Sequence, residues 1–422
     1  MTETKTFWQK RYTLLLLAFL AFIICYLDRV NISLAAISMQ QEFGWSDTTK
    51  GYVFSSFFWG YLLMQIGGGY LANRYGGKLV LGSAVVFWSI FTILTPTAAM
   101  LSLPALFAVR FLMGVGEAGL APSSLGIVGR WFPKNEQTRA MGFLSSGAIM
   151  GTILALLLGG WIINAYGWPA IFYLFGASGF IWVIFWYFFV TDQPATHPTI
   201  SAKEVALIEA GGGVTEKAKN IPWRELLTKK QVWALCTAGF ASSWTLYIFL
   251  SWLPSYFADV HGLNISGAGI YSLFPWISMF LMLNVGGWVG DSMIKKGISL
   301  TLTRKLMVGF GLIGGAVMMI FMRDATSPEI ATLLMFCALG ITAFSFAAIV
   351  PNCLDITPKF ADILYGTVNT FGTLAGALGA PIAGYILTST GSYDNVFIVT
   401  AAISLVGACI FLFFGSGEKI VD

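Results

Sequence analysis

The amino-acid sequence predicts an all-α membrane protein with twelve transmembrane helices in two six-helix bundles. Of its 422 residues, 57% are hydrophobic and only 10% are charged, whereas an average soluble domain has about 25% charged residues. Twelve apolar runs of roughly 20 residues can each cross about 30 Å of hydrocarbon as a helix. They begin near residues 12, 51, 79, 103, 140, 169, 232, 267, 302, 329, 362 and 393. The alternating pattern of a transmembrane β-barrel is absent from these runs.

A polar segment, residues 191–231, separates six apolar runs from the next six. Its prolines, glycines and lysines are typical of a linker. We therefore expect an N-terminal six-helix bundle over 1–190 and a C-terminal six-helix bundle over 232–422. Within the linker, Ser201 followed three residues later by a glutamate has the pattern of a helix cap. This pattern predicts a short amphipathic helix around Ala202–Ile208.

The distribution of basic residues predicts the orientation in the membrane. In a twelve-span arrangement only Lys50 and Arg323 fall on one side. The other side has the basic residues of the linker together with Lys5, Lys10, Arg11, Arg74, Lys78, Arg130, Lys134, Arg139, Lys295, Lys296, Arg304 and Lys305. The positive-inside rule places both termini and the linker in the cytoplasm, in a multi-pass protein of the cell inner or plasma membrane. The first run has no cleavage site of small residues, so we expect it to be retained.

Four charged residues inside apolar runs indicate a functional site. Asp28 and Arg29 lie in the first run, and Arg110 and Glu117 lie in the fourth. A charge at the bilayer centre costs at least about 2.5 to 3.5 kcal/mol on insertion scales. Arg110 and Glu117 are two helical turns apart and share one face, whereas Asp28 and Arg29 point about 100° apart. We therefore expect Asp28 and Arg29 to have partners on other helices, and the four charges to serve the transport of an anion.

Several longer motifs extend over nearly the whole chain. They are GYLANRYGGK at 69–78, RFLMGVGEAG at 110–119, YLDR at 26–29, FFWGY at 57–61 and NCLDITP at 352–358. A related loop, GWVGD with two lysines after it, at 287–296, indicates an internal repeat. The motifs resemble those of the major facilitator superfamily and, within it, the anion:cation symporter family. That family includes bacterial sugar-acid carriers and animal carriers of glutamate, sialic acid and phosphate.

The resemblance implies functions for individual residues. It implies that Asp28 and Glu117 couple transport to protons. The residues that it implies for binding of the anion are Arg29, Arg110, Tyr26, Tyr61 and Asn369. Asn352 is polar in a span that could have been wholly apolar, so we expect a hydrogen bond to the substrate or between helices.

Gating is expected at the loops on the linker side of the membrane. The residues that we assign to it are Asn73, Arg74, Lys78, Asp291 and Asp355. The usual acid of the first loop motif is replaced by Asn73, which weakens a carboxylate-based gate there, whereas Asp291 keeps an acid in the second half. Asp355 lies just before Pro358, where a contact at the helix end is expected.

Three positions depart from relatives in the family. Phe54 and Ser242 stand where the vesicular glutamate carriers have a histidine and an arginine, which disfavours a vesicular glutamate function. Ile149 stands where the sugar-acid carriers have a glutamine that reaches the substrate. The pocket is therefore expected to suit a heavily hydroxylated ligand less well, or to contact its hydroxyl groups elsewhere.

These residues predict a proton-coupled symporter that imports an organic anion, such as a sugar acid or another carboxylate, by alternating access. Burial favours the protonated form of Asp28 and Glu117, whereas neighbouring arginines favour the carboxylate. Protonation would free Arg29 and Arg110 for the substrate, and loss of the protons would restore the internal pairs. Arginine suits a carboxylate because it offers a planar two-point contact.

Other readings stay open at this point. One is a proton-independent facilitator or exchanger of phosphate or organic anions, and a less favoured one is a membrane-embedded transferase, for which no acid, base or nucleophile cluster is visible. Sodium coupling is also open. We expect no enzyme activity, no cofactor, no metal site from the five unpaired cysteines, no nucleic-acid partner, and a monomer in the lipid bilayer.

Overall fold

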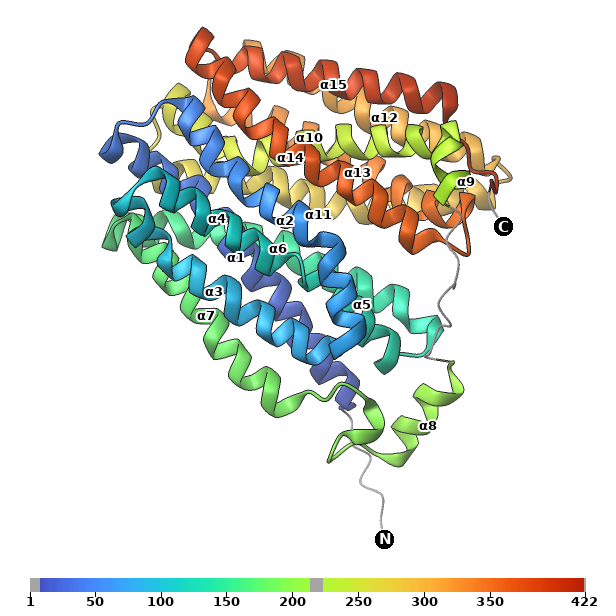
Figure 1. Cartoon of the computed structure of the whole chain (residues 1–422). Helices are drawn as coiled ribbons and strands as arrows, with labels where there is room; N and C mark the ends of the chain where they lie inside the picture. Colours follow the sequence, from blue (N-terminus) through green and yellow to red (C-terminus); the bar gives the residue numbers. More distant parts are fainter. Residues whose placement is uncertain (1–7, 213–222, 421–422) are drawn as a thin grey trace. The chain divides into compact units, whose positions relative to one another are not determined.

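The computed structural model describes residues 8–212 and 223–420, and within them it is helical without β-strands (Figure 1). The helices before the linker are α1 (Lys10–Phe43), α2 (Asp47–Tyr75), α3 (Gly77–Leu101), α4 (Leu103–Glu117), α5 (Leu120–Trp131), α6 (Lys134–Tyr166) and α7 (Trp168–Phe189). Those of the linker are η1 (Pro194–Thr196), α8 (Ala202–Ala210) and α9 (Trp223–Thr228). Those after it are α10 (Lys230–His261), α11 (Ile265–Lys295), α12 (Leu300–Phe321), η2 (Met322–Asp324), α13 (Pro328–Ile356), α14 (Ala361–Thr390) and α15 (Tyr393–Phe414).

The predicted fold class, an all-α membrane protein, is confirmed. Eleven of the twelve predicted apolar runs each lie in one long helix, and the fourth lies in α4 and α5. Eleven candidate spans are long and apolar enough to cross a membrane within the described part of the chain. The long helix outside that set is α2, whose sequence contains two serines, Gln65 and three successive glycines. Part of the predicted linker, residues 213–222, and the basic residue Lys5 lie outside the described residues.

The fourth span is broken into α4 and α5, where the sequence pattern predicts one continuous helix. The break lies at Ala118 and Gly119. Pro122 explains it, because a proline ring inside a helix collides with the carbonyl group four residues earlier and offers no N–H to it. Glu117 is consequently the last residue of α4, and its side chain leaves the helix at an interruption of the span.

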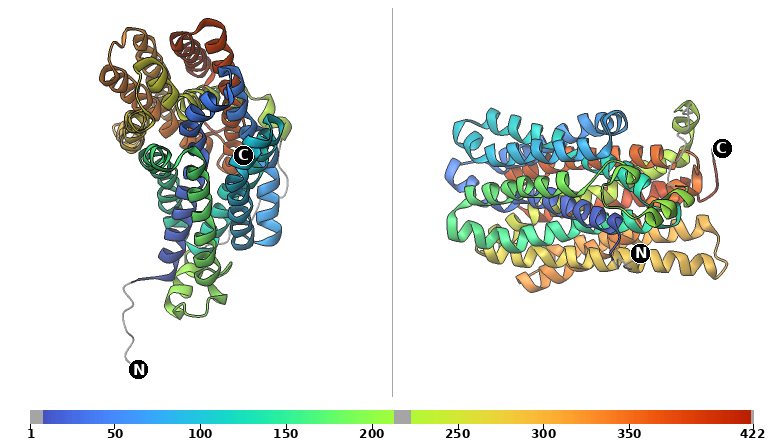
Figure 2. Two further views of the ribbon diagram at one scale, coloured as in Figure 1. Left: turned by 90° about the vertical axis from the view of Figure 1, so that its left-hand side faces the viewer. Right: turned by 90° about the horizontal axis from the view of Figure 1, so that it is seen from below.

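The described chain forms two compact units, and three long helices contribute to both of them. Unit 1 comprises the described residues of Met1–Arg29, Trp59–Ala155 and Pro169–Lys217. Unit 2 comprises those of Val30–Phe58, Leu156–Trp168 and Ala218–Asp422. The shared helices are α1, α2 and α6. Figure 2 gives two further views of the helices described above. The domain boundaries expected from the sequence, 1–190 and 232–422, stay a prediction.

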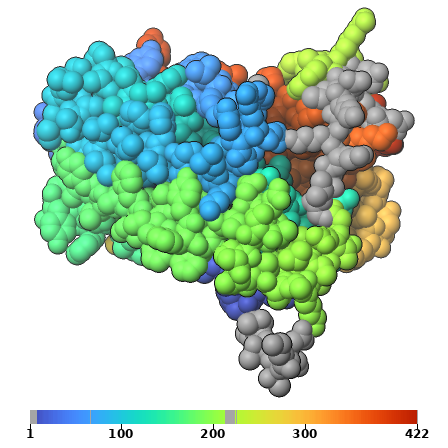
Figure 3. Space-filling model, turned by 60° about the horizontal axis from the view of Figure 1, so that its bottom comes forward, coloured from blue at the N-terminus to red at the C-terminus, as the bar shows by residue number. Residues whose placement is uncertain are grey.

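The linker helix α8 holds the beginning of α1 within unit 1. The Ser201 hydroxyl accepts a hydrogen bond from the Glu204 N–H, which confirms the predicted cap. The buried Glu204 carboxylate in turn accepts hydrogen bonds from the backbone N–H groups of Lys10 (3.1 Å) and Arg11 (3.0 Å). It therefore caps the N-terminus of α1 from almost two hundred residues away. Figure 3 shows α8 on the molecular surface.

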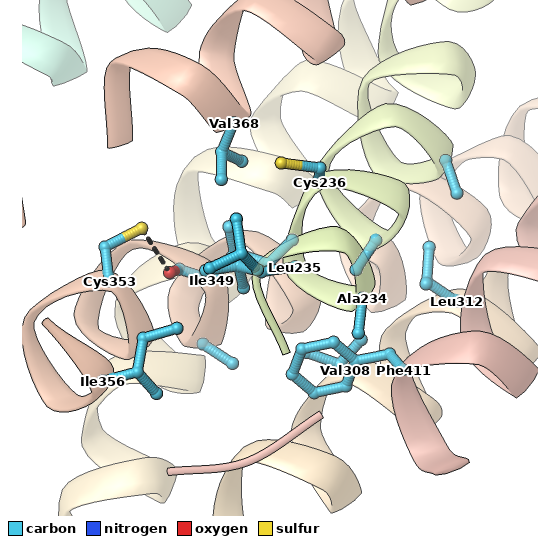
Figure 4. Packing of buried hydrophobic residues seen from close by; sticks show 14 of the residues in the cluster. Ala234, Leu235, Cys236, Val308, Leu312, Ile349, Cys353, Ile356, Val368 and Phe411 are labelled. Carbon is cyan, nitrogen blue, oxygen red and sulfur yellow. Dashed lines mark hydrogen bonds between the residues drawn. The ribbon is translucent and has the colours of Figure 1, made fainter. Parts of the chain in front are cut away.

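The core of unit 2 is apolar and closely packed at its linker end. Cys236 and Val368 lie in this cluster with Cys353, whose thiol donates to the Ile349 carbonyl oxygen (Figure 4). The chain after α15 folds back onto this end, because the Ile420 N–H donates to the Ile356 carbonyl oxygen at 2.9 Å. The Gly417 N–H also donates to the Thr301 hydroxyl at 2.9 Å, so the terminal segment is bonded to the beginning of α12 and the end of α13.

At the opposite end of unit 2, the beginning of α2 packs tightly on the end of α14. Gly51 lies so close to α14 that an added Cβ would be 2.6 Å from the Ala380 carbonyl oxygen. The Ser55 hydroxyl donates to the Ala377 carbonyl oxygen at 2.6 Å, and the Thr48 hydroxyl donates to that of Thr388 at 2.9 Å. Helix α2 is therefore bonded to α14 over two successive turns.

A buried lysine lies beside this contact. The Lys50 ammonium donates to the Gln40 side-chain oxygen at 2.6 Å and pairs with Asp47 at 3.1 Å. It also lies 4.9 Å from the centre of the Trp252 ring. Fully buried lysines are rare unless they are paired, and here the last turns of α1 and the first residue of α2 supply the two polar partners.

Candidate functional site

The central feature of unit 1 is a buried ion pair between α1 and α4. Arg29 Nη2 and Nε lie 2.8 Å and 3.0 Å from the same Glu117 oxygen, Oε2. The Arg29 side chain is 7% exposed and that of Glu117 is fully buried. The sequence predicts that Arg29 has its partner on another helix, and the structure confirms this by identifying that partner as Glu117.

Two tyrosines enclose the Arg29 guanidinium. Its carbon lies 4.6 Å from the Tyr26 ring centre and 5.0 Å from that of Tyr61 on α2. Arg29 Nη1 also donates to the Tyr26 hydroxyl at 3.4 Å. Cation–π contacts of this kind are favourable when the cation is shielded from water. The structure thus brings together three of the residues that the sequence analysis assigns to anion binding.

Asp28 is completely buried in the same region. Neither of its carboxylate oxygens has a hydrogen-bond partner of good geometry among the described residues. The groups that act on it electrostatically are Glu117 and Arg110, and the Trp88 indole of α3 also faces it. An ionised carboxylate without hydrogen bonds is strongly disfavoured in such a place. The surroundings of Asp28 therefore suit a neutral carboxyl group.

Arg110 lies on α4, two turns before Glu117, and is 2% exposed. Its Nη1 lies 3.2 Å from the Met113 sulfur. It acts electrostatically on Glu117, Arg29 and Asp28. All four charged residues predicted from the sequence are therefore gathered in unit 1, with two positive and two negative groups when all are ionised.

The sequence analysis missed Cys25, which also contacts the ion pair. Its thiol donates to Glu117 Oε2 at 3.1 Å, and Arg29 Nη2 lies 3.8 Å from its sulfur. Cys25 precedes Arg29 by one helical turn, so both face the same way. That spacing was the signal in the sequence that could have identified it.

The two asparagines assigned to substrate contact belong to unit 2. The buried Asn352 amide donates to the Ser416 carbonyl oxygen at 2.9 Å, so it fastens the terminal segment to α13. Asn369 lies on α14, and its carbonyl oxygen accepts a hydrogen bond from the Thr373 hydroxyl. The substrate roles of both stay predictions, and the bond to Ser416 favours a structural role for Asn352.

At the first gating loop, the carboxylate that contacts the basic residues comes from the linker. Asn73 is exposed, and Arg74 Nη1 donates to the Tyr70 hydroxyl. The Lys78 N–H, at the start of α3, donates to Asp192 Oδ1 at 3.1 Å, and Asp192 also pairs with Arg130 at 2.9 Å. Asp192 therefore holds three segments together where Asn73 has no charge, and the sequence analysis did not identify it.

Of the two acids assigned to gating in the second half of the chain, one forms an ion pair and the other is exposed. Asp355 on α13 pairs with the buried Arg304 of α12 at 2.7 Å, as expected of a contact at a helix end. Asp291 is exposed near the end of α11. Of these two acids, Asp355 has the geometry of a helix-to-helix tie.

Comparison with known proteins decides the family. Residues 17–361 match the Major Facilitator Superfamily. The chain belongs to this superfamily. The transporter has the same fold as a bacterial homologue of the human lysosomal transporter Spinster, with a TM-score of 0.80, 18% identity and coverage of 96% of both chains. It is also similar to the D-xylose-proton symporter, with a TM-score of 0.77, 15% identity and coverage of 97% and 99%.

Curated relatives are more similar in sequence. The transporter is 42% identical to "Sodium-dependent phosphate transport protein 1, chloroplastic" of Arabidopsis thaliana, over 98% of this chain and 80% of that protein. It is 40% identical to "Ascorbate transporter, chloroplastic" of the same plant, over 100% and 78%. It is an anion transporter and not an enzyme. The expected location in a cell inner or plasma membrane is wrong, because these relatives are chloroplast proteins.

Proposed function

We propose that the transporter carries an organic anion together with protons. The single observation that supports this most is the buried Arg29–Glu117 ion pair, with its two bonds to Oε2 at 2.8 and 3.0 Å. Breaking a buried pair by removing one charge is strongly unfavourable, because the other charge is left uncompensated. Protonation of Glu117 therefore creates a site that needs an anion beside Arg29.

A carboxylate substrate meets that need. It can accept two N–H groups from one guanidinium in a plane, as Glu117 does with a single oxygen. The rings of Tyr26 and Tyr61 cover the faces of the guanidinium, so an incoming anion has to approach Arg29 along its edge. The transporter thus exchanges an internal carboxylate for that of the substrate.

Asp28 is proposed to carry a second proton. Its carboxyl group is buried without hydrogen bonds of good geometry, so it ionises only when a cation becomes available to it. Arg110 acts on it electrostatically and becomes such a cation when the bound anion leaves. Each charge that crosses a potential of 100 mV contributes about 2.3 kcal/mol. Two protons with one monoanion would make transport electrogenic and concentrative.

The names of the relatives support this class of substrate. Phosphate and ascorbate, carried by the two Arabidopsis proteins according to their names, are both anions that a guanidinium can bind by two oxygens. We propose a small organic acid as the substrate. The transporter is proposed to act as a monomer in the bilayer.

The test is uptake into proteoliposomes with an imposed pH gradient. A panel of ascorbate, phosphate and sugar acids identifies the substrate by uptake above that of empty vesicles. We expect an acidic exterior to drive accumulation in the wild-type protein. Glu117→Gln should abolish accumulation but retain exchange of labelled for unlabelled substrate, because glutamine mimics the protonated acid. Glu209→Gln, at an exposed acid of α8, is the control and should behave as wild type.

Two results would refute the proposal. Accumulation by Glu117→Gln under a pH gradient would show that this acid does not couple transport to protons. Uptake that needs internal anion and ignores the pH gradient would identify an exchanger. Sodium coupling has support in the name of one relative, and a sodium gradient at equal pH on both sides distinguishes it.

A further inference from the structure

We propose that Cys25 is a positioning residue that fixes which oxygen of Glu117 receives the transported proton. The inference rests on the proposed function of Glu117 as a proton carrier. The thiol and Arg29 together give Glu117 Oε2 three donors, at 2.8, 3.0 and 3.1 Å. Glu117 Oε1 is buried and has no hydrogen-bond partner among the described residues.

The unequal bonding of the two oxygens determines where a proton binds. A carboxylate oxygen has about two lone-pair sites, and three donors already share those of Oε2. A proton that arrived there would have to displace one of them. Oε1 has free lone pairs, so the proton binds at Oε1 and the existing bonds to Oε2 need not be broken first.

Protonation at Oε1 affects the donors to Oε2 differently. Both bonds from Arg29 depend on the negative charge of the carboxylate and weaken when it is neutralised. The thiol is a neutral donor, and its bond to a neutral carbonyl oxygen remains. Cys25 therefore keeps the protonated Glu117 side chain in place while Arg29 turns to the substrate.

The Cys25 thiol is fully buried and lies beside the Glu117 carboxyl group, to which it donates as a neutral group. The groups that act electrostatically on Glu117 or Cys25 are Asp28 and Arg29 on α1 and Arg110 on α4. From α2, Tyr61 contacts Arg29, and from α3, Trp88 faces Asp28. None of these groups supplies a donor of hydrogen-bonding geometry to Oε1, so the thiol is the neutral group that orients the acid.

The proposal is tested by infrared difference spectroscopy during a pH titration of the reconstituted protein. The carboxyl C=O band of Glu117 is the band that Glu117→Gln removes. The bond from the thiol to the charged carboxylate is stronger than its bond to the neutral acid, so loss of the thiol disfavours the charged form more and raises the proton affinity of Glu117. We therefore expect Cys25→Ala to move the midpoint of this band upward by about half to one pH unit. Cys25→Val, which keeps more of the thiol's volume, should do the same.

Two comparisons separate the hydrogen bond from packing. Cys25→Ser keeps a donor and should return the midpoint to within about 0.2 units of wild type, a shift that corresponds to a small part of one hydrogen bond. Cys236→Ala, at a buried cysteine in the apolar core of unit 2, should leave it unchanged. The pH profile of uptake should move with the band in each variant.

The outcomes are distinguishable from those of the proposed function. An unchanged midpoint in both Cys25→Ala and Cys25→Val, or an equal shift in Cys25→Ser, would overturn the positioning role. A shifted band with uptake that ignores the pH gradient would support the positioning role and refute proton symport. An unshifted band with intact gradient-driven uptake would do the reverse.

Discussion

The close contact of α2 with α14 predicts that Gly51→Ala impairs transport. The new methyl carbon would lie 2.6 Å from the Ala380 carbonyl oxygen and 2.9 Å from the Pro381 Cα, both of which are backbone atoms that cannot turn aside. Ordinary contacts begin at 3.4 Å, so the helices must separate locally by about 0.8 Å. Overpacking of this kind costs about 1 to 3 kcal/mol, which corresponds to a change of about 5- to 150-fold in an equilibrium.

The measurement is the initial rate of substrate exchange in proteoliposomes at equal protein content. If the closed contact is part of the transport cycle, the rate in Gly51→Ala should fall by a factor within that range. Gly366→Ala is the matched control, because it places a methyl group on α14, the partner helix, at a point where nothing lies within 4 Å. A wild-type rate in Gly51→Ala, with the same thermal stability as the control, would refute the reasoning.

Three further predictions concern other contacts. Glu204→Ala removes the remote cap of α1 and should lower the free energy of unfolding by about 0.5 to 2 kcal/mol, read as a lower Tm, whereas an unchanged Tm would contradict the capping role. Lys50→Met removes the buried cation beside Asp47 and leaves that carboxylate without its ion pair, so the Tm should fall, and an unchanged Tm would contradict the pairing role. Tyr61→Leu removes one ring from Arg29 and should raise the KM for the anion about 2- to 30-fold, for a cation–π contact of about 0.5 to 2 kcal/mol, and an unchanged KM would exclude the contact from binding.

The spans could be predicted from the sequence because hydrocarbon imposes a length and a composition on every crossing helix. The cap at Ser201 could also be predicted, because a cap depends on neighbours in the chain. The break after Glu117 was missed although Pro122 stands in the sequence. Spans are predicted from their apolar composition, and a single proline changes the mean hydropathy of a run too little to mark a break.

The charged residues of the site could be identified from the sequence, but their pairing could not. Hydropathy singles out Arg29 and Glu117 because each is expensive in an apolar span. The two are 88 residues apart, so only the packing of α1 on α4 shows that they meet. The same limit applies to Asp192, whose position after α7 gives no sign that it pairs with Arg130.

The sharing of α1, α2 and α6 between the two units has a consequence for experiments on this molecule. Each of these helices is continuous, yet its two parts pack in different units. Two spectroscopic labels placed on one part of such a helix and on its neighbours in the same unit would therefore report on that unit alone. Expressing residues 1–190 alone would deprive these helices of their neighbours in unit 2, and expressing residues 232–422 alone would leave unit 2 without them. Cutting the chain at the linker is therefore a poor way to isolate a working part.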